Sequence, residues 1–398
     1  MTPEQNIFIC CLKDFCHGNK TEEPNITFDK EIFFNTAEEQ SLAGLFYCQC
    51  PWINKKEFHQ AFLSDIFYSV NRRDMLQEIT NKLSEQEIPF LCMKGSVFRD
   101  YYPVPELRSM GDIDIVIQPE NKEKVDHIFV NELGYSKYVD NHSVWLYYIK
   151  EFQFEVHNHM FYEELTNDFN YVEYFDDIFD NMHLGSVFGI SSQYMYVPDE
   201  NYHFLYLMTH TAKHIINHGT GFRPYLDMVM FTQNNDLDWK WIKDELRKLK
   251  LLEFTETCFA FCERWFDVKM PLDHKELDKR FYDEITAKTF NDGTFGLENE
   301  ENEGASSAKA LKKSNGHYWL TTVRRTLRLI FPPYNDMILI PWYSFLNGKP
   351  WLLPFAWVYR WFYCIKHKFK ESFRKISEPF RIKQKIEERQ EYIDSWGL

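Results

Sequence analysis

The stretch GDIDIVI at residues 111–117 places two carboxylates inside an apolar, strand-like pattern. Because side chains alternate along a β-strand, Asp112 and Asp114 are expected on one face, about 6–7 Å apart along the backbone. Two hard oxygen ligands at that separation suit a magnesium ion that bridges nucleotide phosphates. The stretch KGS at residues 94–96 follows an apolar run, and its turn offers backbone N–H groups and a hydroxyl to a triphosphate. Together the two stretches predict a nucleotide site.

The surrounding pattern predicts a mixed sheet flanked by helices, from about residue 71 to residue 160. Apolar residues at helical spacing predict a helix over 71–85, and a further helix is expected from Val97. In the stretch FQFEVH at residues 152–157, alternation puts Gln153, Glu155 and His157 on the polar face. The remaining predicted elements are strands at 89–93 and 112–118, a helix from Pro119 to about Gly134, and a hairpin of 135–140 with 144–149 around Asn141 and His142.

The rest of the chain is predicted to be mainly helical, so the fold class is α+β: a mixed sheet with flanking helices, plus a helical domain. A long helix is expected from Glu200 to about His218, followed by three shorter ones. Residues 291–316 are rich in Gly, Asn, Glu and Ser, which is typical of a flexible linker. The predicted regions are an N-terminal helical region at 1–70, the sheet domain at 71–160, the helical domain at 161–290, the linker at 291–316 and an aromatic, basic C-terminal region at 317–398.

The composition limits the classes of function. The net charge of −15 argues against broad, sequence-independent binding of nucleic acid. The N-terminus has no signal-peptide pattern, and no uncharged apolar run reaches the roughly 18 residues of a membrane-spanning helix. Nine cysteines, an odd number without a zinc-binding spacing, favour free thiols in the cytoplasm.

The segment 338–390 has a different character from the rest of the chain. Its Trp and Tyr residues stand beside a basic stretch, Arg360 to Arg389, that contains ten Lys or Arg and four Glu. Such a combination suits contact with a membrane surface, which would make the protein membrane-peripheral. The favoured alternative is a set of helices packed on the main body with a solvated basic end, and a tail that binds an acidic partner or RNA is a third interpretation.

These motifs resemble the nucleotidyltransferase-fold superfamily shared with polymerase-β-type enzymes, and within it a poorly characterised bacterial nucleotidyltransferase family. The resemblance rests on KGS at 94–96, RSMGDID at 108–114 and FEVH at 154–157. Weaker matches lie at His210, His214, Arg223 and Asp227 and in two proline-containing stretches further on. The resemblance covers most of residues 71–365.

The resemblance implies a two-metal transfer of a nucleotidyl group from an NTP to a hydroxyl. Asp112 and Asp114 would bind Mg²⁺, with Mn²⁺ as an alternative ion, and Glu155 would bind the second ion and act as general base. Many superfamily members have Asp in place of this Glu. Gly95 and Ser96 would hold the β and γ phosphates. Lys94 and Arg108 are the nearest cations for neutralising charge, although Lys94 is equally consistent with a solvated turn residue.

His210, His214 and His218 lie on one helical face, where three imidazoles can bind zinc. No carboxylate or cysteine is set beside them by spacing. The favoured interpretation is that His210 and His214 line the cleft and face the nucleotide or the acceptor.

The resulting prediction is a cytoplasmic, Mg²⁺-dependent nucleotidyltransferase whose hydroxyl acceptor is a sugar or sugar phosphate, a protein side chain or an RNA end. The family is often encoded near polysaccharide loci, which favours the glycan option by analogy. Two other classes stay open. One is a non-catalytic nucleotide sensor or scaffold, and the other is a membrane-peripheral assembly factor.

Overall fold

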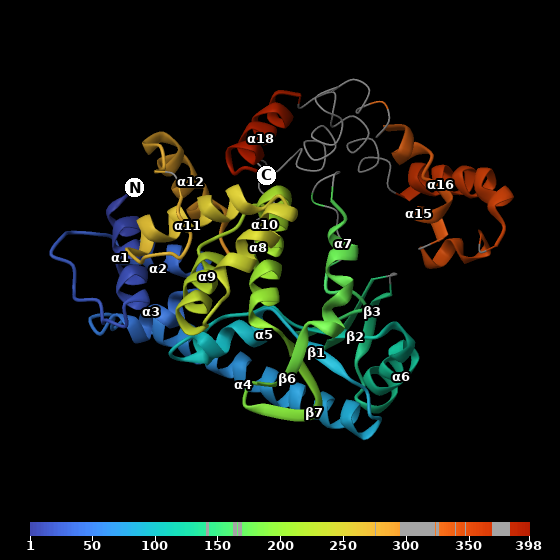
Figure 1. Ribbon diagram of the computed structural model, residues 1–398, viewed down its shortest axis with the longest axis horizontal. Coiled ribbons are helices and arrows are strands. Elements are labelled where there is room, and N and C mark those ends of the chain that lie inside the picture. Colours follow the sequence, from blue (N-terminus) through green and yellow to red (C-terminus); the bar gives the residue numbers. More distant parts are fainter. Residues whose placement is uncertain are drawn as a thin grey trace. The chain divides into compact units, whose positions relative to one another are not determined.

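The computed structural model describes residues 1–140, 143–161, 165, 169–274, 276–294, 323, 326–338, 340–346, 348–367 and 383–398 (Figure 1). These residues form two compact units. The first contains the described residues up to 294 except 216–218, together with 397–398. The second contains 216–218 and the described residues from 323 to 396.

The first unit is built on a seven-stranded mixed sheet with the order β3-β4-β5-β2-β1-β7-β6. Its two central pairings are parallel: β2 pairs with β5, and β1 pairs with β7. The other neighbours are antiparallel. The strands are β1 (Phe90–Cys92), β2 (Asp112–Ile117), β3 (Ser136–Asp140), β4 (Val144–Ile149), β5 (Phe152–His157), β6 (Met182–Val187) and β7 (Ile190–Pro198).

Helices cover the sheet and extend it into a larger body. Their bounds before residue 295 are α1 (Pro3–Cys16), α2 (Lys30–Glu39), α3 (Ala43–Gln49), α4 (Lys56–Glu85), α5 (Gly95–Phe98), α6 (Lys122–His127), α7 (Tyr171–Tyr174), α8 (Glu200–Asn217), α9 (Arg223–Asn234), α10 (Trp239–Lys248), α11 (Leu252–Phe266) and α12 (Lys279–Asp292). Short 3₁₀ or π segments are η1 (Arg99–Tyr101), η2 (Pro105–Leu107), η3 (Pro119–Asn121), η4 (Ile128–Glu132) and η5 (Asp176–Asp180).

Alternation along β2 separates the core from the polar face. Ile113, Ile115 and Ile117 are fully buried in one apolar cluster. The same cluster takes Leu76 and Ile79 from α4, and it also contains residues of α6 and η4. Since successive side chains of a strand point to opposite faces, Asp112 and Asp114 lie on the other face. The hydrophobic effect on one side of β2 therefore fixes where its carboxylates point.

The second unit has its own small core of Met337, Tyr343, Leu346 and Ala356. Two indole N–H groups hold its helix in place, because Trp357 donates to the Pro332 carbonyl and Trp361 to that of Ile330, at 2.8 and 2.7 Å. Its elements are α15 (Tyr334–Ile338), η7 (Pro341–Leu346), η8 (Pro350–Leu352), α16 (Leu353–His367) and α18 (Lys383–Ser395).

The structure confirms the predicted α+β class and most of the predicted strands. The hairpin predicted from 135–140 and 144–149 is the β3–β4 pair, although its turn residues, Asn141 and His142, lie outside the described residues. The helix predicted from Val97 begins earlier, at Gly95, and is short before it passes into η1. The predicted linker lies outside the described residues from position 295 onward, and the division into five regions stays a prediction.

Strands β6 and β7 were not predicted, and they lie in the range that was predicted to be helical. Most side chains of β6 are at least partly exposed, so the strand has no apolar alternation to detect. Its register with β7 also shifts between Leu184 and Ser186. The sheet therefore continues beyond residue 160.

Shortening Phe154 tests the core of the sheet. Its ring is fully buried and lies 5.8 Å from the rings of both Phe129 and Tyr135. Phe154→Ala should lower the free energy of unfolding by about 3–5 kcal/mol, measured by denaturant titration. The control is Tyr138→Ala, since Tyr138 is 77% exposed and its removal should change little. Equal losses in the two variants would contradict this assignment of the core.

Candidate active site

The parallel pairing of β2 with β5 brings the predicted carboxylates together. Asp114 stands opposite Glu155 in the register, and Asp112 stands opposite Gln153. The Gln153 amide donates to Glu155 at 2.7 Å and accepts from the Tyr148 hydroxyl at 2.6 Å. This chain of hydrogen bonds fixes the direction of the Glu155 side chain.

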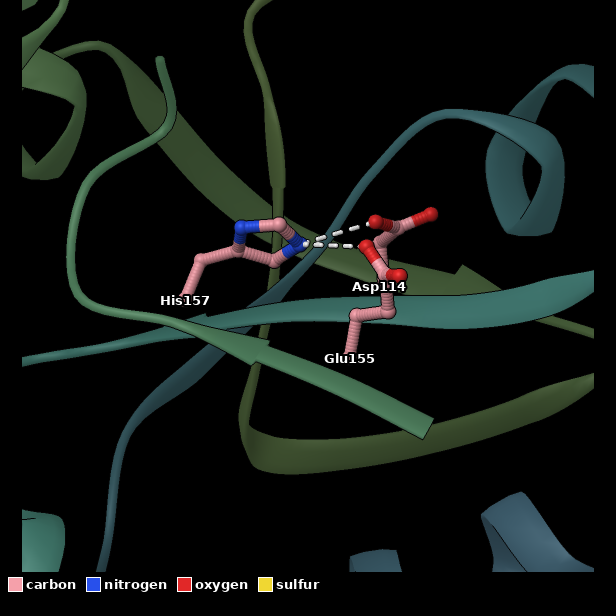
Figure 2. A group of neighbouring side chains, drawn as sticks. All are labelled: Asp114, Glu155 and His157. Carbon is pink, nitrogen blue, oxygen red and sulfur yellow. Dashed lines mark hydrogen bonds and ion pairs between the residues drawn. The ribbon is translucent and has the colours of Figure 1, made fainter. Parts of the chain in front are cut away.

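The imidazole of His157 faces both carboxylates with one ring nitrogen, as Figure 2 shows. Its Nε2 atom is 2.8 Å from Asp114 Oδ1 and 3.5 Å from Glu155 Oε2. One ligand atom from each of the three residues lies within 4.8 Å of the others, and His157 is fully buried. Such a group can hold a divalent metal ion: carboxylates suit Mg²⁺ or Mn²⁺, whereas an imidazole favours the transition metals. Within the described residues, the histidines of α8 form no comparable group.

Lys94 enters the site through an unusual backbone conformation. Its φ of 55° and ψ of −132° lie in a region that non-glycine residues rarely adopt, which is typical of strain at functional sites. The backbone N–H donates to His203 Nε2 at 3.3 Å, and the ammonium lies 2.5 Å from Asp114 Oδ1. Burial lowers the pKa of His203 to about 3, so the imidazole is neutral and its ring nitrogen can accept this hydrogen bond. The ammonium of Lys94 therefore lies against the acidic face of β2, not in solvent.

Burial and neighbouring charges shift the pKa values of Asp112 and Asp114 in opposite directions. Burial, reinforced by Asp114 and Glu155, raises the pKa of Asp112 to about 7. Burial also opposes ionisation of Asp114, but Lys94 and His157 outweigh it and hold the pKa of Asp114 well below its usual range. The face thus carries more negative charge than its own cations neutralise, which is the electrostatic condition for binding a cation.

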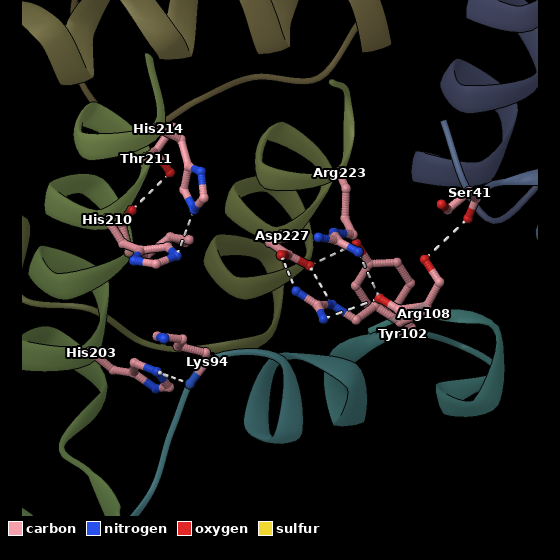
Figure 3. A network of polar contacts seen from close by, with 12 residues as sticks. Ser41, Lys94, Tyr102, Arg108, His203, His210, Thr211, His214, Arg223 and Asp227 are labelled. Carbon is pink, nitrogen blue, oxygen red and sulfur yellow. Dashed lines mark hydrogen bonds and ion pairs between the residues drawn. The ribbon is translucent and has the colours of Figure 1, made fainter. Parts of the chain in front are cut away.

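Arg108 has a buried partner that sequence reasoning did not assign. It donates to both oxygens of Asp227 on α9, at 3.1 and 2.6 Å, and Tyr102 donates to the same carboxylate at 2.8 Å (Figure 3). A Cβ added at Gly95 would come within 2.5 Å of Arg108 Nη1, so a larger residue would collide with a side chain that Asp227 holds in place. Gly95 is therefore required for this close approach.

Arg223, at the start of α9, adds a second guanidinium beside this pair. Its Nη1 donates to the carbonyl of Ser109 at 3.1 Å. Burial, followed by repulsion from Arg108, lowers the pKa of Arg223 to about 10, so it stays charged at neutral pH. Arg223 is only a weak match to the family in the sequence and had no predicted role, because its position beside Arg108 depends on a long-range contact.

These residues surround a cavity of about 300 Å³ with two different walls. Asp112, Asp114 and Glu155 line it from the sheet. Arg223 lines it from α9, and His210, Lys213 and His214 line it from α8. The Nε2 atoms of His210 and His214 are 3.0 Å apart, and burial, together with His214 and Lys94, lowers the pKa of His210 well below its usual value. The cavity thus has one acidic wall, which could hold a metal ion, and a facing wall of cations and imidazoles.

Ser96 does not reach this cavity. The cavity is lined by Lys94 and Gly95 but not by Ser96, whose hydroxyl is fully buried without a hydrogen-bond partner among the described residues. The predicted contact of Ser96 with phosphate stays a prediction.

A second cavity, of about 330 Å³, adjoins the first. The two share Arg108, Met110 and Gly111, which precede the acidic strand directly. Asp65, Arg72 and Glu151 are among the other residues that line it.

The sheet, the acidic pair on β2 and the facing carboxylate on β5 define a protein of the nucleotidyltransferase class. A family model described as "Uncharacterised nucleotidyltransferase" matches residues 27–267, which is more than half of the chain. The chain belongs to this family, as its motifs predicted. No curated protein and no solved structure matches it significantly.

Removing the charge of Asp227 tests the buried pair. Arg108 and Asp227 are both largely buried, and Asp227→Asn leaves the guanidinium without its counter-charge. The free energy of unfolding should fall by about 3–5 kcal/mol, measured by denaturant titration. As a control, Glu284→Gln breaks the exposed Arg280–Glu284 pair and should have little effect. A loss no larger than that of the control would show that Arg108 does not depend on Asp227.

Proposed function

We propose that the protein transfers a nucleotidyl group from an NTP to a hydroxyl acceptor with the help of Mg²⁺ or Mn²⁺. The observation that carries this proposal is the cavity whose acidic wall, Asp112, Asp114 and Glu155, faces the cationic wall from α8 and α9. A triphosphate with its metal ions has the matching distribution of charge. Membership of the nucleotidyltransferase family supports the reaction class.

Each carboxylate has a distinct role in the proposed reaction. Asp112 and Asp114 would ligate the metal, which when bound supplies positive charge to the triphosphate and to the developing transition state. Glu155 would accept the proton of the acceptor hydroxyl, and its hydrogen bond from Gln153 fixes its orientation for this step. His157 would hold Asp114 and Glu155 at their mutual distance.

The cations would bind the phosphates. Lys94 already pairs with Asp114, so we expect its ammonium to move to a phosphate oxygen when a metal ion binds that carboxylate. Arg223 and Lys213 would neutralise the leaving pyrophosphate from the opposite wall, with His210 as a neutral hydrogen-bonding group and His214 beside it. Gly95 lines the cavity, where its backbone N–H would donate to a phosphate oxygen.

The acceptor would enter by the second cavity. It shares Arg108, Met110 and Gly111 with the nucleotide cavity and lies beside the first residues of β2. Sugars, protein hydroxyls and RNA ends all remain candidates for the acceptor.

All nine cysteines are free, and the sulfur atoms of Cys11 and Cys50 lie only 3.3 Å apart without a bond between them. An odd number of cysteines favours free thiols, and we propose that the protein acts in the cytoplasm. Among the described residues, no helix has the length and apolar character needed to cross a membrane.

Labelled nucleotides test the proposal directly. Each NTP, labelled in turn at the α and γ phosphates, is incubated with the full chain, Mg²⁺ or Mn²⁺ and a cell lysate as acceptor pool, with Asp112→Ala/Asp114→Ala as the control. We expect the α label in a product and release of pyrophosphate. Transfer of the γ label would indicate a kinase, and NTP binding without transfer would indicate a sensor or scaffold.

Neutralising Asp112 should separate metal binding from folding. Asp112→Asn and Asp114→Asn should each abolish Mg²⁺-dependent NTP binding, because the metal loses an anionic ligand. The melting temperature should not fall for Asp112→Asn, which relieves repulsion between close carboxylates, whereas it should fall for Asp114→Asn, because the buried Lys94 ammonium loses its counter-charge. Calorimetric titration and thermal melting measure the two effects. A sharp fall in melting temperature with unchanged metal affinity would make the carboxylates structural.

Glu155→Gln should separate binding from chemistry. The amide keeps the size of the side chain but cannot accept the proton, so NTP binding should persist while transfer falls by about 100-fold or more. Binding by calorimetry and transfer by label release give the two readouts. Equal loss of both would make Glu155 a primary metal ligand, and Glu155→Asp tests whether the longer side chain limits the rate.

A further inference from the structure

The second unit exposes aromatic side chains that its own core does not use. Within the 22 residues from 342 to 363, eight large hydrophobic side chains are exposed. The most exposed are Trp342 and Phe362 at 72%, Phe355 at 70% and Trp351 at 68%. A soluble surface rarely concentrates so many large apolar groups, so this patch has a binding role.

On α16 these side chains form one regular stripe. Its members are exposed and follow the spacing i, i+3, i+4, i+7, i+8 of a single helical face: Phe355, Val358, Tyr359, Phe362 and Tyr363. The inner face is separate, because Ala356 belongs to the small core and Trp357 and Trp361 bond to backbone carbonyls. The helix is therefore apolar on both sides, and only the inner side serves the fold.

The sequence on either side of the stripe has a one-sided charge. Between Asp336 and Glu371 the sequence has no acidic residue but five basic ones: Lys349, Arg360, Lys366, Lys368 and Lys370. Trp and Tyr with Lys and Arg, and no Asp or Glu, is the composition of a surface that lies in the headgroup region of an anionic bilayer.

We propose that the outer face of α16, together with Trp342 and Trp351, binds the surface of an anionic lipid bilayer. The helix would lie in the plane of the membrane over its length of about 22 Å, with the Phe and Val side chains among the upper acyl segments and the Tyr and Trp rings at the headgroups. This attachment is peripheral and reversible, and it does not depend on the proposed reaction.

Vesicle binding by the full chain tests the proposal without any nucleotide. Sedimentation with vesicles of phosphatidylcholine alone, or mixed with phosphatidylglycerol, should show binding to the anionic mixture that weakens as salt is added. Phe355→Ser/Phe362→Ser should lower the partition coefficient by about tenfold or more per Phe. The matched control, Tyr138→Ser/Leu184→Ser, removes side chains 77% and 58% exposed in the first unit and should bind like the parent.

A spectroscopic measurement on the folded chain gives a second readout. Brominated lipids quench tryptophans at the bilayer surface, so they should quench the parent protein, and Trp342→Phe/Trp351→Phe should lose most of that quenching while still binding. Failure of the parent to bind anionic vesicles, or equal binding by the Phe355→Ser/Phe362→Ser variant, would overturn the proposal. Self-association that this variant abolishes, without vesicle binding by the parent, would overturn it in favour of a second copy as partner.

Discussion

The site depends on the burial of several carboxylates on one face of the sheet. Asp114 is buried and Asp112 and Glu155 are partly buried, so the three carboxylates repel one another, and burial together with this repulsion raises the pKa of Asp112. Lys94 and His157 compensate part of this charge by binding Asp114. The backbone of Lys94 is strained at the residue whose ammonium binds Asp114, which is typical of functional sites. A cation that replaced the ammonium would free Lys94 for an anionic ligand.

A second buried charge pair joins the sheet to the helices. Arg108 precedes β2, while Asp227 lies on α9, 119 residues further along the chain. The pair therefore sets the distance between the acidic strand and the helical wall that carries Arg223. The family match from residue 27 to 267 includes both walls of the cavity, which agrees with a site that neither the sheet nor the helices form alone.

The parts of the fold and of the site that could be predicted are those with a local pattern in the sequence. Alternation along residues 112–117 and 152–157 predicted which side chains share a face of each strand, and the parallel pairing of β2 with β5 then places Asp114 opposite Glu155. Contacts between distant segments could not be predicted in this way. The pairing of Arg108 with Asp227, the exclusion of Ser96 from the cavity and the addition of β6 and β7 to the sheet all depend on tertiary packing. The partly exposed β6 left no periodic signal at all.

The acidic chain as a whole and its basic segment around α16 interact in opposite ways with an anionic membrane. With a net charge of −15, the protein as a whole is repelled by an anionic membrane, whereas the acid-free stretch from 337 to 370 is attracted to it. The exposed Phe355 and Phe362 then add apolar contact with the bilayer. The inner face of α16 does not use these side chains, because Trp357 and Trp361 hold it to the fold through their indole hydrogen bonds. If the outer stripe stabilised the fold, its side chains would be buried, so their exposure is explained by an external partner.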